Sequence, residues 1–438
     1  MRAAAGRSAR DWLAEPGRGG GYACGMRDKQ ELYAAILGVQ LPWQVTEVDF
    51  SKEVEVVRVR IRLRRGTRLR CPTCNKVCPG YDTRRRSWRH LDTCQYKTIL
   101  DADVPRVECS AHGVVQITVD WAEPGSSFTA LMEALIIDWL KEASILAVAR
   151  RMGLTWDQVD GIMKRAVRRG LARREAVAPE AIGIDETSFQ KRHEYVTVVT
   201  DLDSSDVLYV ADDRKKESIQ GFFDQLEPAD MIRLNVVSMD MWRPYIDVVE
   251  LNVHKAEEKI CFDKFHVAKY LGDAVDKVRR DEQREQLADG DRSLVKTKYT
   301  WLRNPENSAL SQNAFFKRMK RVAVRTSRAW ALKEQAMCLW HYATRTWARK
   351  GWKAWISWAK RSRLEPMKRV AATVESHLEG ILNAVVLKAT NAASESINAR
   401  IQRVKRMACG FRNRERFRNA IYFHLGGLDL YPATHTIS

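Results

Sequence analysis

The sequence predicts a multidomain α/β protein whose mixed-sheet core is interrupted by a helical insertion. Strand-like apolar runs alternate with helical patterns between residues 181 and 272, whereas residues 273–385 keep helical spacing throughout. The chain has 438 residues, which is more than one hydrophobic core ordinarily organises. We therefore expect about two to four domains.

The pattern divides the chain into consecutive segments. They are a disordered basic leader (1–25), N-terminal strands with a zinc-binding domain (26–125), a helix-turn-helix (126–176), the first part of the core (177–272), the helical insertion (273–385) and the final core helices (386–438). The leader is rich in Gly, Ala and Arg and lacks the apolar centre of a signal peptide. Because MRDKQELYAAILGV has the features of a natural start, Met26 competes with Met1 as the first native residue.

The charge of the chain predicts a polyanionic partner. Lys and Arg number 74 against 55 Asp and Glu, which gives a net charge of +19 and a pI near 9.6. A positive surface binds nucleic-acid phosphates independently of sequence, although a merely soluble basic protein has the same composition. Long apolar runs that would span a membrane are absent from the sequence.

Residues 56–64 alternate between apolar and basic side chains. The apolar set is Val57, Val59, Ile61 and Leu63, and an arginine follows each of them. This period of two predicts a strand that is buried on one face. The arginine face either contacts DNA phosphates or protects the edge of a sheet.

Cysteine and histidine spacing predicts a structural zinc site. The pairs Cys71-Pro-Thr-Cys74 and Cys109-Ser-Ala-His112 supply the four nitrogen and sulfur ligands of a closed tetrahedral Zn²⁺ site. Buried free cysteines are the alternative interpretation. The spare thiols that can replace His112 as fourth ligand are Cys78 and Cys94.

The uneven distribution of the cysteines also bears on the compartment. Nine cysteines, five of them in residues 71–109, do not form the regular framework of a disulfide-rich secreted protein. A reducing compartment fits better, so we expect a cytoplasmic, nucleoid-associated protein.

The segment ASILAVARRMGLTWDQVDGIMKRAVRR predicts a helix-turn-helix. Gly153 marks the turn, Thr155 caps the second helix, and Ala147 and Val148 are expected to face inward. The second helix of such a motif enters the major groove of DNA. Its side chains that suit base edges and phosphates are Gln158, Lys164, Arg165, Arg168 and Arg169. A plain pair of packed helices is the alternative.

Residues 182–262 predict the element order βββαβαβ. Strands are expected at 182–185, 195–200, 207–210, 234–239 and near 260, with helices at 217–226 and 244–249. Asp185 and Asp240 each follow an apolar strand, where a carboxylate is costly unless a cation or a partner balances it. Asp263 follows a shorter strand and competes with Asp240, although a solvated turn is the common role of a single acidic residue.

The insertion is rich in tryptophan. Its tryptophans are Trp301, Trp330, Trp340, Trp347, Trp352, Trp355 and Trp358. Aromatic rings among basic residues either stack on unpaired bases or pack in a core. We expect packing for most of them and DNA contact for one or two.

A third carboxylate, Glu395, lies on the final predicted helix, which begins near Asn391. The residues of this helix that are expected to face inward are Ile397, Ile401 and Val404. Basic residues of the same helix that suit phosphates are Arg403 and Arg406. Three converging oxygen ligands suit Mg²⁺ or Mn²⁺, and a pair of such ions supports in-line phosphoryl displacement. A Glu in the first turn of a solvated helix is the alternative.

Several phrases of the sequence resemble a known family, the zinc-finger DDE transposases of bacterial insertion sequences (the ISL-three type). The phrases are IDETSF, DMWRPY, FDKFHVAKYL, KYTWLRNPEN and SESINARIQRVKRMACGFRNRERFRNAIYF, in the family's order across most of residues 70–425. The resemblance implies a ribonuclease H-like core with a catalytic triad of Asp185, Asp240 and Glu395 that holds Mg²⁺. It also implies that Asp263 and His266 form an auxiliary DxxH signature.

The resemblance further implies a function and its partners. The expected activity is metal-dependent cleavage of the element's ends followed by strand transfer, with terminal inverted repeats and target DNA as substrates and a homodimer or higher oligomer as the assembly. The family usually has cysteine as its fourth zinc ligand, so His112 is a departure that keeps tetrahedral ligation. A DNA-binding regulator with an inactive core, and a ribonuclease H-like nuclease or resolvase, are the alternatives.

Overall fold

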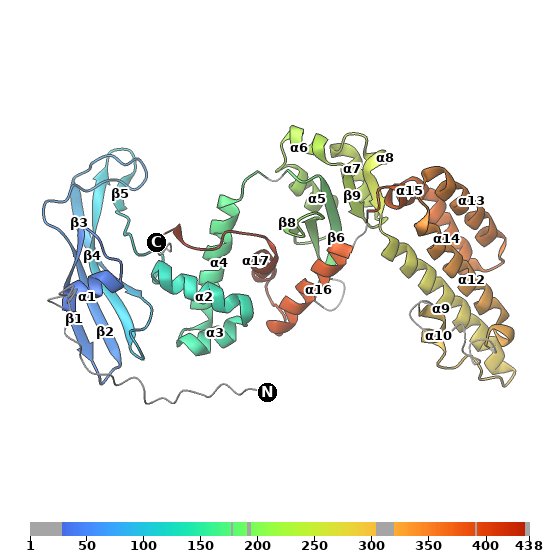
Figure 1. The fold of residues 1–438 in the computed structure, drawn as a ribbon, viewed down its shortest axis with the longest axis horizontal. Helices are drawn as coiled ribbons and strands as arrows, with labels where there is room; N and C mark the ends of the chain where they lie inside the picture. Colours follow the sequence, from blue (N-terminus) through green and yellow to red (C-terminus); the bar gives the residue numbers. More distant parts are fainter. Residues whose placement is uncertain (1–28, 177, 191–193, 304–318, 390–391, 434–438) are drawn as a thin grey trace, which may run out of the picture. The chain divides into compact units, whose positions relative to one another are not determined.

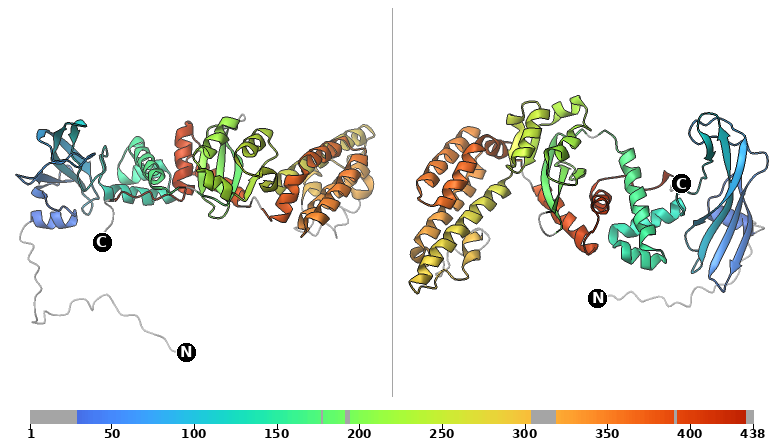
Figure 2. Two further views of the ribbon diagram at one scale, coloured as in Figure 1. Left: turned by 90° about the horizontal axis from the view of Figure 1, so that it is seen from above. Right: turned by 180° about the vertical axis from the view of Figure 1, so that it is seen from behind.

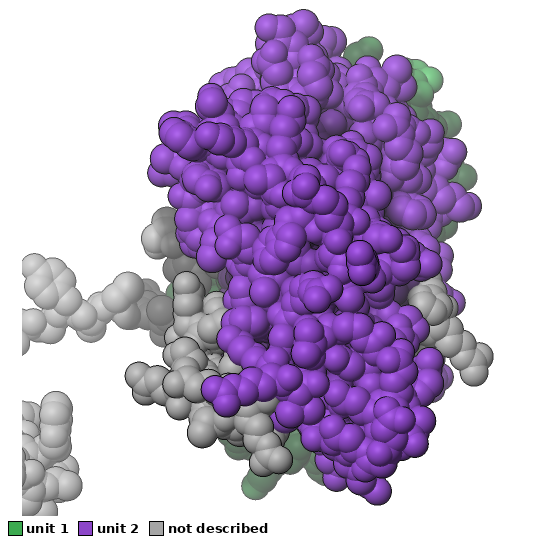
Figure 3. Space-filling model, turned by 90° about the vertical axis from the view of Figure 1, so that its right-hand side faces the viewer, with its two compact units in different colours: residues 1–135, 432–438 green, residues 136–431 purple. Residues whose placement is uncertain are grey.

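A computed structural model of the chain describes residues 29–176, 178–190, 194–303, 319–389 and 392–433, without the side chains of residues 392–395. The expected leader and the candidate start at Met26 lie outside the described residues. The chain divides into two compact units, residues 1–135 with 432–438, and residues 136–431 (Figure 3). The finer segment boundaries given above stay predictions. Within the described ranges, no helix is both long and apolar enough to cross a bilayer.

In its described residues up to Gln116, the first unit contains a five-stranded sheet and one short helix. Its elements are α1 (Lys29–Ile36), β1 (Trp43–Ser51), β2 (Val56–Leu63), β3 (Gly80–Arg89), β4 (Lys97–Cys109) and β5 (Gly113–Gln116), in the strand order β1-β2-β4-β3 with β5 paired to β4. The predicted one-sided strand is confirmed, because Val57, Val59 and Ile61 are buried. The interpretation of this strand as a sheet edge is wrong, since β2 lies between β1 and β4.

Two arginines of β2 form ion pairs with the neighbouring strands. Arg58 contacts Asp101 of β4 at 3.1 Å, and Arg60 contacts Glu47 of β1 at 2.9 Å. These pairs balance part of the positive charge on the polar face of the sheet.

The predicted helix, turn and helix are confirmed as α3 (Ile145–Met152) and α4 (Trp156–Arg173), which follow α2 (Ala130–Glu142). Gly153 closes α3 with a φ of 62°, a left-handed conformation that favours glycine. Thr155 and Gln158 form a capping box, in which the side chain of each residue accepts a hydrogen bond from the amide of the other. Local sequence therefore determines both ends of the turn.

One inward position of α3 differs from the prediction. Val148 is buried as expected, but Ala147 is exposed and Ala149 is buried instead. The side chain of Ser144 accepts a hydrogen bond from the Ala147 amide, and this cap places Ala147 in the exposed first turn.

The second sheet carries the predicted strand order and confirms the mixed α/β class. Its strands are β6 (Ala181–Gln190), β7 (Glu194–Asp201), β8 (Val207–Ala211), β9 (Val236–Met239) and β10 (Ile260–Phe262), in the spatial order β10-β9-β6-β7-β8. Strands β6, β7 and β8 are antiparallel neighbours, whereas β6, β9 and β10 are parallel. The connecting helices are α5 (Lys216–Phe223), α6 (Pro228–Arg233), α7 (Arg243–Asn252) and α8 (Ala256–Lys259).

In its described residues, the insertion consists of helices, and the longer ones pack side by side (Figures 1 and 2). They are α9 (Lys264–Ala288), α10 (Lys298–Leu302), α12 (Val324–Cys338), η3 (Leu339–His341), α13 (Arg345–Arg361), α14 (Glu365–Ser376) and α15 (Leu378–Val386). Trp301, Trp352 and Trp355 are fully buried, and Trp330 and Trp340 pack against the same hydrophobic cluster. The expectation of core packing is confirmed for these five, whereas the remaining two are exposed, Trp347 and Trp358.

The chain returns to the second sheet with α16 (Ala392–Met407) and α17 (Arg414–Leu425). The three predicted inward residues of α16 are buried, Ile397, Ile401 and Val404. Asn391, the predicted start of this helix, lies outside the described residues. α17 packs against α4, so the C-terminal helices contact both the sheet and the helix-turn-helix.

Candidate active site and metal centre

Parallel register aligns Asp185 with Asp240. Gly183 of β6 pairs with Ser238 of β9, so the residues two positions further along each strand, Asp185 and Asp240, reach the same level. Neighbouring residues of adjacent parallel strands point to the same face of a sheet. The two predicted acidic residues therefore lie side by side on adjacent strands. Asp240 directly follows the end of β9, whereas Asp185 lies in the middle of β6, because this strand continues to Gln190 instead of ending at residue 185 as predicted.

The third strand adds Asp263 and His266 to the same edge. Phe262 pairs with the last residue of β9, which puts Asp263 level with Asp240. Asp263 accepts a hydrogen bond from the Phe265 amide and caps α9, and its Oδ2 lies 3.2 Å from Nδ1 of His266. Nε2 of His266 lies 3.9 Å from Oδ2 of Asp240. The Asp-x-x-His phrase thus forms a chain of contacts that leads to Asp240.

Asp185, Asp240 and Asp263 lie level with one another on the sheet and are called the acidic edge below. Helix α16 contacts β6 at this acidic edge. The side-chain amide of Asn398 donates to Oδ2 of Asp185 at 2.6 Å. Gln402 and Lys405, further along α16, donate to later residues of β6 at 3.0 and 2.9 Å. Glu395 lies in α16 three residues before Asn398, but its side chain is outside the described part of the structure.

Burial and like charge shape the protonation of the site. Burial raises the pKa of Asp185 to about 6, and the carboxylates of Asp263 and Glu186 add to this effect against the opposing charge of His266. Burial by itself lowers the pKa of His266. The hydrogen bond to Asp263 and the negative charges of Asp240 and Asp185 have a larger effect, so the pKa of His266 is raised. Buried carboxylates that repel one another favour a cation between them.

Two side chains that contact the acidic residues were not predicted from the sequence. They are Asn398, which holds Asp185, and Tyr270, whose hydroxyl donates to Oδ1 of Asp240 at 3.4 Å. Each lies about one helical turn after a residue that the sequence did single out, Glu395 and His266. Residues three or four apart share a helix face, and this spacing is the signal that would have found them.

The four predicted zinc ligands come together in the first unit. The ligand atoms of Cys71, Cys74, Cys109 and His112 all lie within 4.8 Å of one another, and among the described residues no other group of three or more potential ligands does so. Cys74 Sγ lies 3.7 Å from Cys109 Sγ, and His112 Nδ1 lies 3.5 and 3.6 Å from the sulfurs of Cys109 and Cys71. A tetrahedral Zn²⁺ with bonds of about 2.0–2.3 Å separates its ligand atoms by roughly 3.5–3.8 Å. The donor set therefore fits zinc.

Neither spare thiol is part of this group of mutually close ligand atoms. Cys78 lies beside the group, where its thiol contacts Cys109, and it stays the alternative fourth ligand, whereas Cys94 is exposed in a separate turn. The pKa of Cys109 is lowered to about 6 by hydrogen bonds from the Ala111 amide and from His112. Such stabilisation of the thiolate favours metal binding, because the thiolate is the form that ligates.

The exposed face of α4 is smaller than predicted. Arg169 is buried and donates a hydrogen bond to the carbonyl of Leu430, so the expectation that it contacts DNA is wrong. Lys164 is exposed but forms an ion pair with Glu415 of α17, and Gln158 serves the capping box. The predicted DNA-contacting residues that stay exposed outside these pairs are Arg168 of α4 and Arg403 and Arg406 of α16, while Arg165 is half-buried.

Comparison with known families agrees with this arrangement. A family model for transposases matches residues 182–421, a model for the helix-turn-helix domain of transposase family ISL3 matches residues 117–167, and a model for the zinc finger of transposases IS204/IS1001/IS1096/IS1165 matches residues 67–112. The predicted zinc finger, helix-turn-helix and transposase domain are thereby confirmed.

Individual relatives carry the same name. The chain is 27% identical over 352 residues to the transposase for insertion sequence element IS1001 of Bordetella parapertussis, which covers 79% of this chain and 86% of the relative. It is 29% identical over 413 residues to the transposase for insertion sequence element IS1557 of Mycobacterium tuberculosis, which covers 87% of this chain and 92% of the relative. Because the transposase model alone spans more than half of its residues, the chain belongs to the ISL3 family of insertion-sequence transposases.

Proposed function

We propose that this transposase cuts and joins DNA through Mg²⁺ held by Asp185, Asp240 and Glu395. The observation that carries the proposal is the hydrogen bond from Asn398 to Asp185, because it anchors α16 at the acidic edge of the sheet. Residues three apart share a helix face, so position 395 precedes this contact by one turn on the same side of the helix. Asp185 and Asp240 supply the other two carboxylates from adjacent strands.

The residues fit a hard divalent cation. Mg²⁺ and Mn²⁺ bind carboxylate oxygens, and such a cation would offset the repulsion that the carboxylates of Asp263 and Glu186 exert on the partly buried Asp185. When bound, a pair of these ions stabilises the attacking and leaving oxygens of a phosphodiester displacement. The reaction supported is hydrolysis that frees a 3′-hydroxyl at the element's end, followed by attack of that hydroxyl on target DNA.

The chain's own side chains orient these carboxylates. The Asn398 amide and the Glu186 backbone amide donate to different oxygens of Asp185, and Tyr270 and the Met241 amide donate to Asp240. Asp263 fixes the ring of His266, whose second nitrogen faces Asp240. Such partners restrict the directions in which a carboxylate can present its free lone pairs.

DNA recognition is assigned to the other domains. The helix-turn-helix binds the terminal inverted repeats with Arg165 and Arg168, and the exposed Arg403 and Arg406 of α16 hold phosphates near the cut. The zinc ion, held by the cysteine and histidine ligands at 71, 74, 109 and 112, stabilises the first unit. A homodimer or higher oligomer holds the two ends of the element together, bound to DNA of the nucleoid.

Nicking of a supercoiled plasmid that carries the complete element tests this function. We expect cleavage at the element's ends with Mg²⁺ and none without it, and loss of cleavage in Asp185→Asn, Asp240→Asn and Glu395→Gln. Asp203→Asn, which changes an exposed turn residue, is the matched control. A wild-type protein that binds the ends but never cuts them supports a regulator with an inactive core instead. Preferential cleavage of branched DNA or of RNA–DNA hybrids supports a resolvase or ribonuclease.

A further inference from the structure

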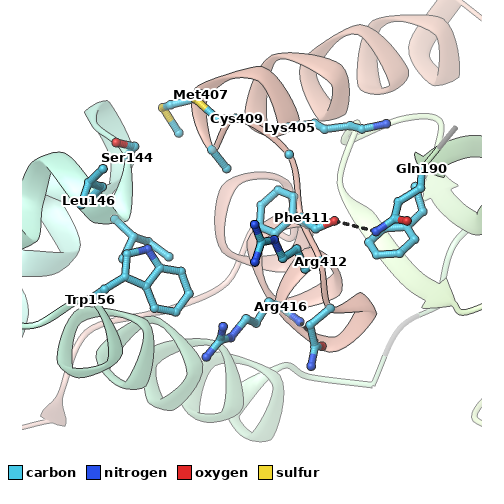
Figure 4. Close-up of a pocket in the computed structure, with 15 residues that line it drawn as sticks. Ser144, Leu146, Trp156, Gln190, Lys405, Met407, Cys409, Phe411, Arg412 and Arg416 are labelled. Atoms are coloured by element: carbon cyan, nitrogen blue, oxygen red, sulfur yellow. Dashed lines mark hydrogen bonds between the residues drawn. The ribbon is translucent and has the colours of Figure 1, made fainter.

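A cavity of 840 Å³ lies among α3, α4, the end of β6 and the turn between α16 and α17 (Figure 4). All of these elements belong to the second unit. The size falls in the range of about 300–1,000 Å³ that is typical of ligand sites. None of the predicted catalytic residues lines this cavity, so it is distinct from the acidic edge.

Aromatic and apolar side chains form much of the wall. Trp156, the first residue of α4, approaches from the helix-turn-helix, and Phe411 approaches from the turn between α16 and α17 (Figure 4). Phe411 is held in place by a ring contact with Phe417 at 5.1 Å, and its carbonyl accepts a hydrogen bond of 3.1 Å from Gln190. Two flat faces thus stand on separate elements across one cavity.

The charged residues of the lining are all positive. They are Lys405, Arg412 and Arg416, and the lining contains no carboxylate. The Arg416 guanidinium stacks on the Trp156 ring at 4.3 Å and forms an ion pair with Asp160 at 3.1 Å. Arg412 is exposed and, among the residues that the structure describes, has no hydrogen-bond or ion-pair partner. This cation is available to an anionic ligand.

Helix α16 links the cavity to the acidic edge. Asn398, near the middle of the helix, contacts Asp185, and Met407, nine residues later at the end of the helix, lines the cavity. A rise of 1.5 Å per residue puts about 13 Å between these positions, which is the length of roughly four stacked nucleotides. A strand whose phosphate lies at the acidic edge therefore reaches the cavity a few nucleotides away.

We propose that this cavity binds one unpaired DNA base, stacked on Trp156, while Arg412 contacts the phosphate of the same nucleotide. Base stacking on an aromatic ring tolerates any sequence, and the positive lining selects a nucleotide over an uncharged apolar ligand. The inference rests on the proposed function, because it places the base within about four nucleotides of the phosphate that is cut. It extends that function because the protein then binds an unpaired base of the DNA strand in addition to the duplex that the helix-turn-helix recognises.

Fluorescence of 2-aminopurine tests the assignment. The probe is a 12-nucleotide thymidine strand with one central 2-aminopurine, titrated with the full-length protein without added Mg²⁺ and without chelator, so that zinc stays bound. We expect binding to quench the probe because the base stacks on Trp156. In Trp156→Leu we expect the quenching to disappear and the affinity for the strand, relative to a 12-base-pair duplex, to fall about tenfold, in line with stacking energies of about 1–3 kcal/mol.

Further variants separate stacking from folding. Trp156→Phe keeps an aromatic face and is expected to retain most of the quenching. Arg412→Ala is expected to lower the affinity for the strand without changing the quenching at saturation. Tyr299→Leu changes an exposed aromatic residue of the insertion, 69% exposed, and is expected to behave like wild type. Quenching that survives in Trp156→Leu, or that disappears in Tyr299→Leu, would overturn the proposal. Because the titration contains no catalytic metal, failure of the cleavage assay leaves this result intact.

Discussion

Asn398 of α16 holds Asp185 of β6 through a hydrogen bond of 2.6 Å between the side-chain amide and Oδ2. The two residues are separated in the chain by the rest of the sheet and by the whole helical insertion. This contact therefore joins the beginning and the end of the transposase domain at the acidic edge, and the following predictions test its consequences and those of the surrounding fold.

Replacing Asn398 by alanine is expected to reduce Mg²⁺-dependent nicking about 10- to 100-fold, the usual effect of removing a side chain that orients a metal ligand. The Mg²⁺ concentration that gives half-maximal nicking should rise, because Asp185 loses its fixed orientation. Titration of Mg²⁺ in the plasmid assay measures both effects. Unchanged Mg²⁺ dependence would show that the contact has only a structural role.

Arg168 and Arg169 are adjacent in sequence but differ in exposure, so their substitutions should have different effects. Arg168→Ala is expected to weaken DNA binding and to reduce the slope of log K against log salt by about one, because one phosphate contact is lost. Arg169→Ala is expected instead to lower the melting temperature, because the Leu430 carbonyl loses its buried partner. Anisotropy at several salt concentrations and thermal melting distinguish the two; equal salt slopes would contradict the assignment.

The zinc centre is expected to accept a cysteine at position 112 and to lose its metal with alanine. His112→Cys keeps four ligands of the required softness, whereas His112→Ala leaves three. Metal analysis of the purified proteins should give about one zinc per chain for wild type and His112→Cys, and less for His112→Ala. Cys94→Ala, which changes a thiol outside the group, is the control and should retain zinc.

Gly380 of α15 is expected to tolerate no side chain. A β-carbon at this position would overlap the Phe262 ring, which is 5% exposed and immediately precedes Asp263. Gly380→Ala should therefore destabilise the protein by about 1–3 kcal/mol. Gly161→Ala is the matched control, since the nearest atom there is the mobile end of Arg165 at 3.6 Å, and it should be neutral or stabilising. Denaturant titration measures both.

His90 is expected to make the stability of the protein fall in acid. Burial lowers its pKa to about 4, below the ordinary value of 6.5, and the nearby charge of Arg89 acts in the same direction. Between these values the unfolded chain binds the proton that the folded chain rejects, so stability declines as the pH falls from 6.5 towards 4. The loss at pH 5 should be about 2 kcal/mol.

Replacing His90 by glutamine isolates this effect from other acid-sensitive groups. The difference in unfolding free energy between wild type and His90→Gln should change by about 2 kcal/mol between pH 8 and pH 5, in favour of the variant at pH 5. Zinc release affects both proteins alike and cancels in the difference. A constant difference over this range would mean that the folded protein binds this proton as readily as the unfolded chain does.

The zinc ligands, the helix-turn-helix and the strands that carry Asp185 and Asp240 could be predicted because each depends on neighbouring residues. The turn at Gly153 follows from backbone conformation, and the capping of α4 follows from a hydroxyl at Thr155. Ala147 shows the limit of such patterns. It was predicted to face inward, but the Ser144 cap determines where α3 begins and leaves Ala147 exposed in the first turn.

By itself the sequence determined which family the chain resembles, which cysteine and histidine side chains form a group that fits zinc, and which strands are associated with Asp185 and Asp240, because spacing along the backbone is enough for each. Only the tertiary structure decided that Arg169 is buried, that β2 is an internal strand, and that Asn398 reaches Asp185. These features arise from strand register and from helices packed across long chain separations. Such contacts depend on how distant segments of the chain come together in the fold, and no local pattern of residues specifies them.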